Sequence, residues 1–551
     1  MPNLKMKLAI LSLLASVASV RAAASNTNSS HPNNPLTVRT STGTFTGIIE
    51  PDAPNTLQWR SIPFAEPPVA SRRWLPPAKL RRNNTTRPQY ATKFPPSCPQ
   101  FVSSVESMWN LPLTKGNLIY NGAQNDTSGL EGEATSEDCL YLAIWKPTTP
   151  PPTKAGFPVL FFMTGGGFIM GGIDLPWQIP TSWVERSQSA IIVTINYRVN
   201  IFGFPNARGL ATEGISQNLG ILDQRAALEW VQENIAAFGG DPARIMQWGR
   251  SAGSVSADIH AYAYYDDPIA QSYYMESGVV QSGIEADLTF SNFTFVARNV
   301  GCGSPCGADC EDEDGTAELD CMRRVSPTQI SNFIGQYTDR GEAPAIFFSL
   351  VQDERIIFRD YEARAAEGKL ARRPVLISLT ANEFSSLVPW PKENLTDGPW
   401  QTLVTEADVV WVCAAYAATV ARNQLSTTEA PVFRFQYAAE FPNLNVYDWL
   451  GAYHNSETPL VFGTYGLLNH IAPTTEFEVE VSHAMQDRIM AFAEDPYHGP
   501  QKKFGWEPRV VSEATGGDVL RFGAGGKVVE RIDGVEMDGV CTGLGEYNPF
   551  P

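Results

Sequence analysis

A serine at the centre of Gly249-Arg-Ser251-Ala-Gly253 is the first candidate for chemistry in this chain. The pentapeptide follows a short apolar run and precedes a helical pattern, which predicts a strand, a sharp turn and a helix with Ser251 at the turn. Such a turn strains the backbone of the serine and needs glycine where neighbouring backbone comes close. The same pattern also arises by chance in a chain with 44 glycines, where it marks an ordinary turn. The surrounding sequence must decide between the two.

A serine hydroxyl is a weak nucleophile at neutral pH and needs a base that a carboxylate orients. His454 is the best-placed base, because it lies on a loop that follows the strand patterns and can reach over a nucleophile. The alternative for it is an ordinary loop histidine. The other histidines lie in the leader, on the helix after Ser251, in helical patterns and in a Pro/Gly-rich turn, and they are His31, His260, His470, His483 and His498.

Glu383 is the candidate carboxylate because it directly follows the buried strand pattern of residues 374–379. Ligands of open α/β sheets bind at the carboxyl ends of the strands. A solvated loop acid is the alternative. With Glu383, the chain order becomes Ser251, Glu383, His454, which is the order found in α/β-hydrolases.

Gly165-Gly-Gly167 follows another strand pattern and offers closely spaced backbone N–H groups with no side chains in the way. Such donors suit an oxyanion hole, where they stabilise negative charge on a carbonyl oxygen. A flexible turn or a phosphate loop is the alternative. A phosphate loop would continue with Gly-Lys-Ser/Thr, which is missing here, and the net charge of -18 disfavours a polyphosphate ligand.

These residues need a sheet to position them, and from residue 140 onwards apolar strand patterns alternate with longer helical patterns. The alternation predicts an α/β fold with a sheet covered by helices on both faces. An alternating hairpin pattern precedes it over residues 36–49. The expected strands lie at 140–145, 158–163, 189–197, immediately before Ser251 and at 374–379, with a helix over 218–235.

The N-terminus has the layout of a secretory signal peptide, with Lys5 and Lys7, an apolar run over residues 8–20 and small residues over 22–25. We expect a signal peptide over residues 1–22 and a single domain over residues 23–551, because no repeat or linker divides the chain. The apolar run is too short to span a bilayer comfortably, and no later segment is long and apolar enough to do so. The mature protein should be secreted, and its acidity disfavours nucleic acid as a partner.

In an exported protein, asparagine sequons can be glycosylated and cysteines can pair as disulfides. Sequons occur at Asn28, Asn83, Asn84, Asn125, Asn292 and Asn394. The eight cysteines should form disulfides, although spacing alone does not choose their partners. A zinc site is the alternative for the four cysteines of residues 302–321, but their spacing is poor for zinc and no histidine lies nearby. This segment belongs to the region 287–373, which is the expected insertion.

Further motifs run through most of the chain, and together with the Ser251 pentapeptide they resemble the type-B carboxylesterase family, which includes cholinesterases and secreted fungal lipases and esterases. The motifs are Ile62-Pro-Phe-Ala-Glu-Pro-Pro, Ser136-Glu-Asp-Cys-Leu-Tyr-Leu-Ala-Ile-Trp, Gly165-Gly-Gly-Phe, Asn196-Tyr-Arg, Asn218-Leu-Gly-Ile-Leu-Asp-Gln-Arg-Ala-Ala-Leu-Glu-Trp, Phe238-Gly-Gly-Asp-Pro and His454-Asn-Ser-Glu.

The resemblance implies an α/β-hydrolase fold with a central, mostly parallel twisted sheet, helices on both faces and cap insertions. It matches Ser251, Glu383 and His454 to the catalytic triad and implies neither a metal nor an organic cofactor. The oxyanion-hole donors match Gly166, Gly167 and Ala252. Ser282 resembles a supporting serine that contacts the acid and the histidine. The implied disulfides are Cys98–Cys139, Cys302–Cys321 and Cys413–Cys541, which leaves Cys306 and Cys310 to pair locally.

Three departures limit what the resemblance transfers. Arg250 stands before the serine where the family usually has Glu or Gln, and Thr164 stands where many members have His. Only 71 residues (454 minus 383) separate Glu383 from His454, so the family's substrate pockets do not carry over. Trp109 could be compared with a choline-binding tryptophan, but its offset from the first cysteine favours ordinary packing.

The sequence thus predicts a secreted serine hydrolase that cleaves small-molecule carboxylic esters through an acyl-enzyme; it predicts no oligomeric state. One alternative keeps the site but serves a fungal secondary-metabolite pathway as a dedicated esterase, lactonase or acyltransferase. The other is a non-catalytic adhesion or binding protein of the same fold, which the intact set of candidate residues disfavours.

Overall fold

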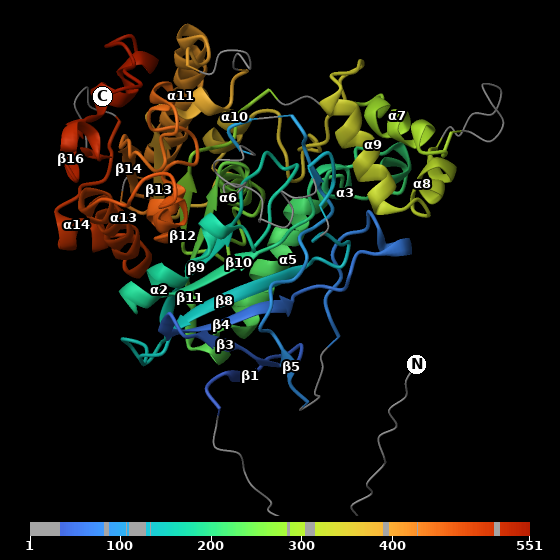
Figure 1. Ribbon diagram of the computed structural model, residues 1–551, viewed down its shortest axis with the longest axis horizontal. Coiled ribbons are helices and arrows are strands. Elements are labelled where there is room, and N and C mark those ends of the chain that lie inside the picture. Colours follow the sequence, from blue (N-terminus) through green and yellow to red (C-terminus); the bar gives the residue numbers. More distant parts are fainter. Residues whose placement is uncertain are drawn as a thin grey trace, which may run out of the picture. The chain divides into compact units, whose positions relative to one another are not determined.

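In the computed structural model of the protein, the buried strand patterns assemble into one large sheet (Figure 1). The structure describes residues 34–81, 87–105, 107–109, 128–132, 134–283, 287–303, 314–389, 396–426, 428–511 and 518–551. Its strands are β1 (Thr37–Arg39), β2 (Thr44–Thr46), β3 (Ile48–Glu50), β4 (Ala53–Pro63), β5 (Gln89–Tyr90), β6 (Phe101–Val102), β7 (Leu130–Glu131), β8 (Tyr141–Pro147), β9 (Phe157–Met163), β10 (Ile191–Ile195), β11 (Gly240–Arg250), β12 (Ser272–Glu276), β13 (Val375–Thr380), β14 (Val432–Tyr437), β15 (Asp518–Phe522) and β16 (Val529–Asp533).

The main sheet has the strand order β16-β15-β14-β13-β12-β11-β9-β10-β8-β4-β3. All neighbours from β15 to β10 in this order are parallel. The pairings at the two ends, which involve β16, β8, β4 and β3, are antiparallel. The prediction of a mostly parallel α/β sheet is therefore confirmed, and the carboxyl ends of its central strands share one edge.

The sheet is covered by helices on both faces. The α-helices of the described residues are α2 (Thr181–Ser187), α3 (Asn200–Gly203), α4 (Arg208–Thr212), α5 (Leu219–Asn234), α6 (Ala252–Ala263), α7 (Ser291–Asn299), α8 (Thr316–Met322), α9 (Pro327–Asp339), α10 (Tyr361–Ala366), α11 (Gln401–Leu425), α12 (Thr458–Phe462), α13 (Glu476–Glu494), α14 (Gly499–Phe504) and α15 (Gly534–Asp538).

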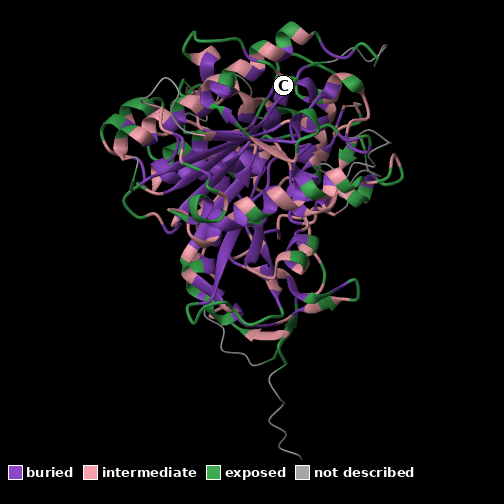
Figure 2. Cartoon of the chain, turned by 90° about the vertical axis from the view of Figure 1, so that its left-hand side faces the viewer, coloured by how far each residue is buried: buried purple, intermediate pink, exposed green. Residues whose placement is uncertain are grey.

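Strand β9 contributes alternate side chains to two hydrophobic cores, one on each face of the sheet. Its residues Val159 and Phe161 belong to a core that includes residues of α5, α6 and α11, whereas Leu160 and Phe162 belong to a second core with residues of α2, α12 and α13. All seven residues of β9 are buried, as expected for a strand that is covered on both sides. Figure 2 shows these buried strands in purple, with the exposed segments on the outer helices and loops.

Helices α7, α8 and α9 of the expected insertion lie together (Figure 1). They share a core of their own with residues of α3 and α4 and with Trp74. Residues 36–551 nevertheless form one compact unit.

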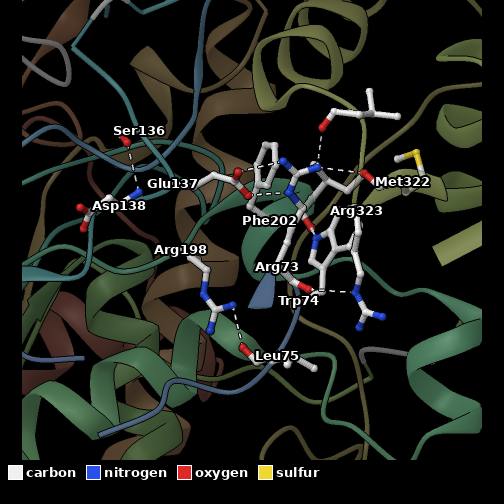
Figure 3. A network of polar contacts seen from close by, with 12 residues as sticks. Arg73, Trp74, Leu75, Ser136, Glu137, Asp138, Arg198, Phe202, Met322 and Arg323 are labelled. Carbon is white, nitrogen blue, oxygen red and sulfur yellow. Dashed lines mark hydrogen bonds and ion pairs between the residues drawn. The ribbon is translucent and has the colours of Figure 1, made fainter. Parts of the chain in front are cut away.

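A buried arginine links this insertion to the remainder of the fold (Figure 3). Both Arg73 Nε and Arg73 Nη2 donate to the Glu137 carboxylate, at 2.5 and 2.8 Å. Arg73 Nη1 donates to the carbonyl oxygens of Met322 and Val325, which end α8 and follow it, at 2.8 and 2.7 Å. The guanidinium also lies over the ring of Trp74. One side chain thus joins the segment before β8 to the insertion.

The described part of the chain contains three disulfides, and they are the three that the resemblance implied. They join Cys98 to Cys139, Cys302 to Cys321, and Cys413 to Cys541. The third connects α11 to the C-terminal segment, across 128 positions of sequence. Cys306 and Cys310 lie outside the described residues, as do the predicted signal peptide and every sequon asparagine except Asn292. Asn292 donates to the carbonyl oxygen of Phe347.

Helix α11 corrects one expectation. Among the described residues, it is the one helix long and apolar enough to cross a membrane by length and composition alone, although the sequence analysis found no such segment. Within the fold, Val412 and Ala415 of this helix pack into the core of the sheet. Its Arg422 is buried and donates to Asp258 of α6 at 2.5 Å. One face of the helix thus packs inside the fold.

We expect Arg73→Met to destabilise the fold by about 3–5 kcal/mol, because it leaves the Glu137 carboxylate, whose side chain is only 11% exposed, without its cation. Chemical denaturation measures the change. Lys79→Ala is the matched control, since Lys79 pairs with Glu229 but its side chain is 80% exposed; a change of less than about 0.5 kcal/mol is expected there. Equal, small effects in both variants would contradict the linking role of Arg73.

Candidate active site

Ser251 occupies the sharp turn between β11 and α6 that the pentapeptide predicts. Its backbone has φ 54° and ψ -121°, a conformation that costs a non-glycine residue free energy. Its N–H donates to the carbonyl oxygen of Glu276 at the end of β12, at 2.8 Å. Its carbonyl oxygen accepts from the N–H of Val255 at 2.9 Å and so opens α6. Both neighbouring elements therefore hold the serine at the carboxyl edge of the sheet.

The two glycines of the pentapeptide are required by close backbone contacts. A Cβ atom at Gly249 would stand 2.0 Å from the carbonyl oxygen of Gly253. A Cβ atom at Gly253 would stand 2.0 Å from the carbonyl oxygen of Met163, the last residue of β9. The first turn of α6 thus packs directly on β9, the strand that leads into Gly165-Gly-Gly167, which we call the glycine loop.

Glu383 and His454 meet as the sequence analysis expects. Glu383 opens a 3-10 turn (Glu383–Ser386) directly after β13, and its Oε1 accepts from the N–H of Thr380 at 2.8 Å. Its Oε2 lies 2.5 Å from His454 Nδ1. Two backbone hydrogen bonds join the segment that carries Glu383 to the loop that carries His454. They run from Asn382 N–H to Ala452 O at 2.9 Å and from His454 N–H to Glu383 O at 3.3 Å.

The imidazole of His454 is buried between aromatic rings. The ring of Trp411, on α11, stands edge-on to it with 5.2 Å between centroids, and the ring of Trp109 does so at 6.2 Å. Burial lowers the pKa of His454; the Glu383 carboxylate opposes this effect and the Arg250 cation adds to it. Trp109 therefore packs against the candidate base, and Trp411 is a neighbour that sequence reasoning missed.

The glycine loop lies beside the serine turn. Gly165 is so close that a Cβ atom there would stand 2.8 Å from the carbonyl oxygen of Arg250, the residue before Ser251. Gly166 has φ 118°, which suits glycine, and its carbonyl oxygen accepts from the N–H groups of Ile169 and Met170. The loop and the start of α6 thus bring backbone donors to the same edge of the sheet.

A cavity of about 200 Å³ lies next to this loop, with Ile169 and Met170 in its wall. Its lining also includes residues of α9 and the segment Ile346, Phe347 and Phe348. Most of this lining is apolar, so the cavity suits an apolar part of a ligand.

Ser282 lies elsewhere, so the prediction that it contacts Glu383 and His454 is wrong. It is exposed, its hydroxyl accepts from the N–H of Tyr361 at 3.2 Å, and it lines a cavity between α6, α10 and α11. The buried serine near the site is Ser277, which donates to Glu457 Oε1 at 3.4 Å. Ser277 and Ser282 each precede a glycine, and the sequence did not show which of the two directly follows the end of β12.

Asp408 of α11 is a further residue that the sequence did not indicate. It is 1% exposed, and its Oδ1 accepts from the N–H of Phe384 at 2.8 Å, directly next to Glu383. Burial raises the pKa of Asp408 to about 8; the Phe384 N–H opposes this effect, and the charge of Glu383 adds to it. No pattern in the sequence distinguishes this aspartate from the other polar residues of α11.

His260, a possible competitor for the role of base, is buried in α6, where its Nε2 lies 3.3 Å from Gln224 Oε1. Burial, with a smaller effect of Arg225, lowers the pKa of His260 to about 3. His498 pairs with Asp495 at an exposed helix start. Within the described residues, no group of three or more His, Cys, Asp or Glu side chains is arranged to hold a metal ion.

Comparison with known proteins fits this geometry. A model of the carboxylesterase family matches residues 34–401. The chain belongs to the carboxylesterase family. A chlorogenic acid esterase of Aspergillus niger is 36% identical to it over 522 residues, which cover 92% of this chain and 94% of that protein. Secreted lipase 5 of Gibberella zeae is 33% identical over 527 residues, with the same two coverages.

A solved structure of a PNB esterase has the same fold, with a TM-score of 0.72 and 24% sequence identity. The match covers 93% of this carboxylesterase and 99% of that chain. The resemblance to type-B carboxylesterases and the α/β-hydrolase fold are thus confirmed, and the esterase relatives support the predicted ester-hydrolysing enzyme over the adhesion alternative.

We expect Gly253→Ala to destabilise this carboxylesterase by about 3 kcal/mol, because the added methyl group forces α6 away from β9. Thermal and chemical unfolding measure the effect. Gly545→Ala is the matched control, since a Cβ atom there meets nothing within 4 Å; it should change stability by less than about 0.5 kcal/mol. A Gly253→Ala protein as stable as the control would show that α6 does not need this close contact.

Proposed function

We propose that this carboxylesterase is an exported serine esterase that cleaves carboxylic esters through an acyl-enzyme on Ser251. The observation that carries the proposal is the 2.5 Å contact between Glu383 Oε2 and His454 Nδ1, at the sheet edge where the strained Ser251 turn also lies. A carboxylate on Nδ1 fixes the tautomer that leaves Nε2 free to accept a proton.

In the first half of the reaction, Ser251 Oγ attacks the ester carbonyl carbon and its proton passes to His454 Nε2. The carbonyl oxygen becomes negative, and backbone N–H groups of Gly166, Gly167 and Ala252 stabilise it. The carbonyl forms again, the bond to the alcohol oxygen breaks, and the imidazolium gives its proton to the departing alcohol. The acyl group is now an ester of the serine.

In the second half, a water molecule loses a proton to His454 Nε2 and its oxygen attacks the acyl carbon. The bond to Ser251 Oγ breaks, the serine regains the proton, and the carboxylic acid leaves. Glu383 stabilises the imidazolium in both halves without taking its proton. The burial of His454 favours the neutral imidazole that each attack requires.

The substrate class is supported by the relatives and by the cavity beside the glycine loop. The apolar lining around Ile169 and Met170 suits an ester with an apolar portion. Similarity to a chlorogenic acid esterase makes chlorogenic acid the first natural ester to assay.

Export is supported by the N-terminal signal-peptide pattern, the three disulfides and the similarity to a secreted lipase. N-terminal sequencing of protein from culture medium should therefore find a chain that starts near residues 23–25. A protein retained in the cytosol with Met1 or Pro2 at its start would contradict export.

We expect Ser251→Ala to lower kcat for p-nitrophenyl acetate, and for any other ester that the native protein cleaves, by about 10⁴–10⁶-fold without loss of folding. A fluorophosphonate probe should label the native protein and fail to label the variant. Ser282→Ala is the matched control and should keep native rates, because Ser282 is exposed on the wall of a different cavity. Native turnover by Ser251→Ala would remove Ser251 from the mechanism.

A further inference from the structure

Asp408 of α11 supplies a hydrogen bond that the turn carrying Glu383 does not make for itself. The turn Glu383–Ser386 follows β13, and the residue before it provides no side-chain cap. The first N–H groups of a helical turn have no partner within that turn. Asp408 Oδ1 accepts from the Phe384 N–H at 2.8 Å, across 24 positions of sequence. A distant side chain thus completes the hydrogen bonding of the backbone next to Glu383.

The surroundings of Asp408 make it an acceptor rather than a charge. Asp408 is 1% exposed, and its second oxygen, Oδ2, is buried without a hydrogen-bond partner among the described residues. Burial raises the pKa of Asp408 to about 8, so at neutral pH the group is mostly protonated and repels the Glu383 carboxylate little. Without Asp408 Oδ1, the Phe384 N–H would lose its partner, at a cost comparable to a lost hydrogen bond.

Trp411 lies on the same side of α11, three positions after Asp408, and residues with this spacing are neighbours on a helix surface. Its ring stands edge-on to the ring of Phe384, with 5.1 Å between centroids. It also stands edge-on to the imidazole of His454, at 5.2 Å. Edge-to-face contacts between aromatic rings are favourable. One indole ring therefore contacts both the residue after the candidate acid and the candidate base.

Helix α11 is a firm support for these contacts. Cys413, two residues after Trp411, is bridged to Cys541. Further along the helix, Arg422 donates to Asp258 of α6 at 2.5 Å. The helix is thus held by groups that are not part of the candidate site, and it can fix the position of the two loops that carry Glu383 and His454.

We propose that Asp408 and Trp411 form a clamp, here called the α11 clamp, that positions the base of this esterase and the acid behind it. Asp408 fixes the backbone next to Glu383, and Trp411 fixes the orientation of the His454 ring. Both are positioning residues, because neither makes or breaks a bond in the reaction. This inference rests on the proposed roles of Glu383 and His454. A misplacement of about 1 Å at such a site can cost about 100-fold in rate.

The test measures kcat per active site, counted with a fluorophosphonate probe, and kcat/KM for p-nitrophenyl acetate, well below the unfolding midpoint. Asp408→Ala and Trp411→Leu should each lower kcat and kcat/KM together by about 10–100-fold, because the loss falls on the chemical steps. Asp408→Asn keeps an acceptor oxygen and should stay within about threefold of the native rate.

Each variant has a matched control on or next to the same helix. Glu406→Ala removes an exposed acid two positions before Asp408. Trp400→Leu removes an indole ring that is 70% exposed directly before α11. Both controls should keep the native kcat and kcat/KM, because neither side chain lies against the turn of Glu383 or the ring of His454.

A second background separates a clamp from general destabilisation. His454→Ala leaves a slow residual turnover that does not use the imidazole. In this background, Asp408→Ala and Trp411→Leu should change the residual rate by less than about twofold, because the group that they position is gone. Losses as large as those in the native protein would show that both residues act elsewhere and would overturn the clamp. If Asp408→Ala does not fold, Asp408→Val takes its place in both backgrounds.

Three further results would overturn the proposal. Native kcat per active site in Asp408→Ala and Trp411→Leu, with only a lower unfolding midpoint, would show a purely structural role. Asp408→Asn as slow as Asp408→Ala would exclude the acceptor role. A raised KM with native kcat in Trp411→Leu would assign the ring to substrate binding.

Failure of the clamp is separable from failure of the proposed function, because Ser251→Ala and His454→Ala test the latter. If these two variants are inactive or nearly so while Asp408→Ala and Trp411→Leu turn over at the native rate, only the α11 clamp is lost.

Discussion

The contact between the first turn of α6 and the end of β9 is the constraint on which the site depends. No side chain fits between the two backbones at Gly253, so the helix begins against the strand. Ser251 must therefore turn within one residue and adopt a strained conformation. The same contact sets the glycine loop beside the serine, because that loop is the continuation of β9. A single packing contact thus places both Ser251 and the backbone of the glycine loop.

Much of this arrangement could be predicted from the sequence because it depends on local rules. Apolar runs of strand length specify the sheet, and the glycines around Ser251 specify the turn. Glu383 and His454 were predictable because each follows an apolar segment and the sheet brings strand ends together. The three disulfides came from resemblance, since spacing alone allows many pairings.

Other residues at the site could not be predicted, because their positions depend on where a strand ends or on how distant segments pack. Ser277 and Ser282 lie five positions apart in similar Ser-Gly pairs, and only the end point of β12 decides which is buried near the site. Asp408 and Trp411 reach the site from α11, whose position is fixed by packing between distant segments. The hydrogen bond from Ser277 to Glu457 joins residues 180 positions apart and could not be predicted from the sequence around either residue.

The two tryptophan rings next to His454 come from distant parts of the chain. Trp109 lies within the segment that the Cys98–Cys139 bridge closes, and Trp411 lies two residues before Cys413, whose bridge reaches Cys541. Tyr547 adds a hydrogen bond to the Ala381 carbonyl oxygen, two residues before Glu383. During translation, Cys541 and Tyr547 leave the ribosome long after Glu383, Trp411 and His454. The surroundings of the Glu383–His454 contact are consequently completed only after residue 547 has been made, and a polypeptide that ends before Cys541 would lack both the bridge and the Tyr547 hydrogen bond.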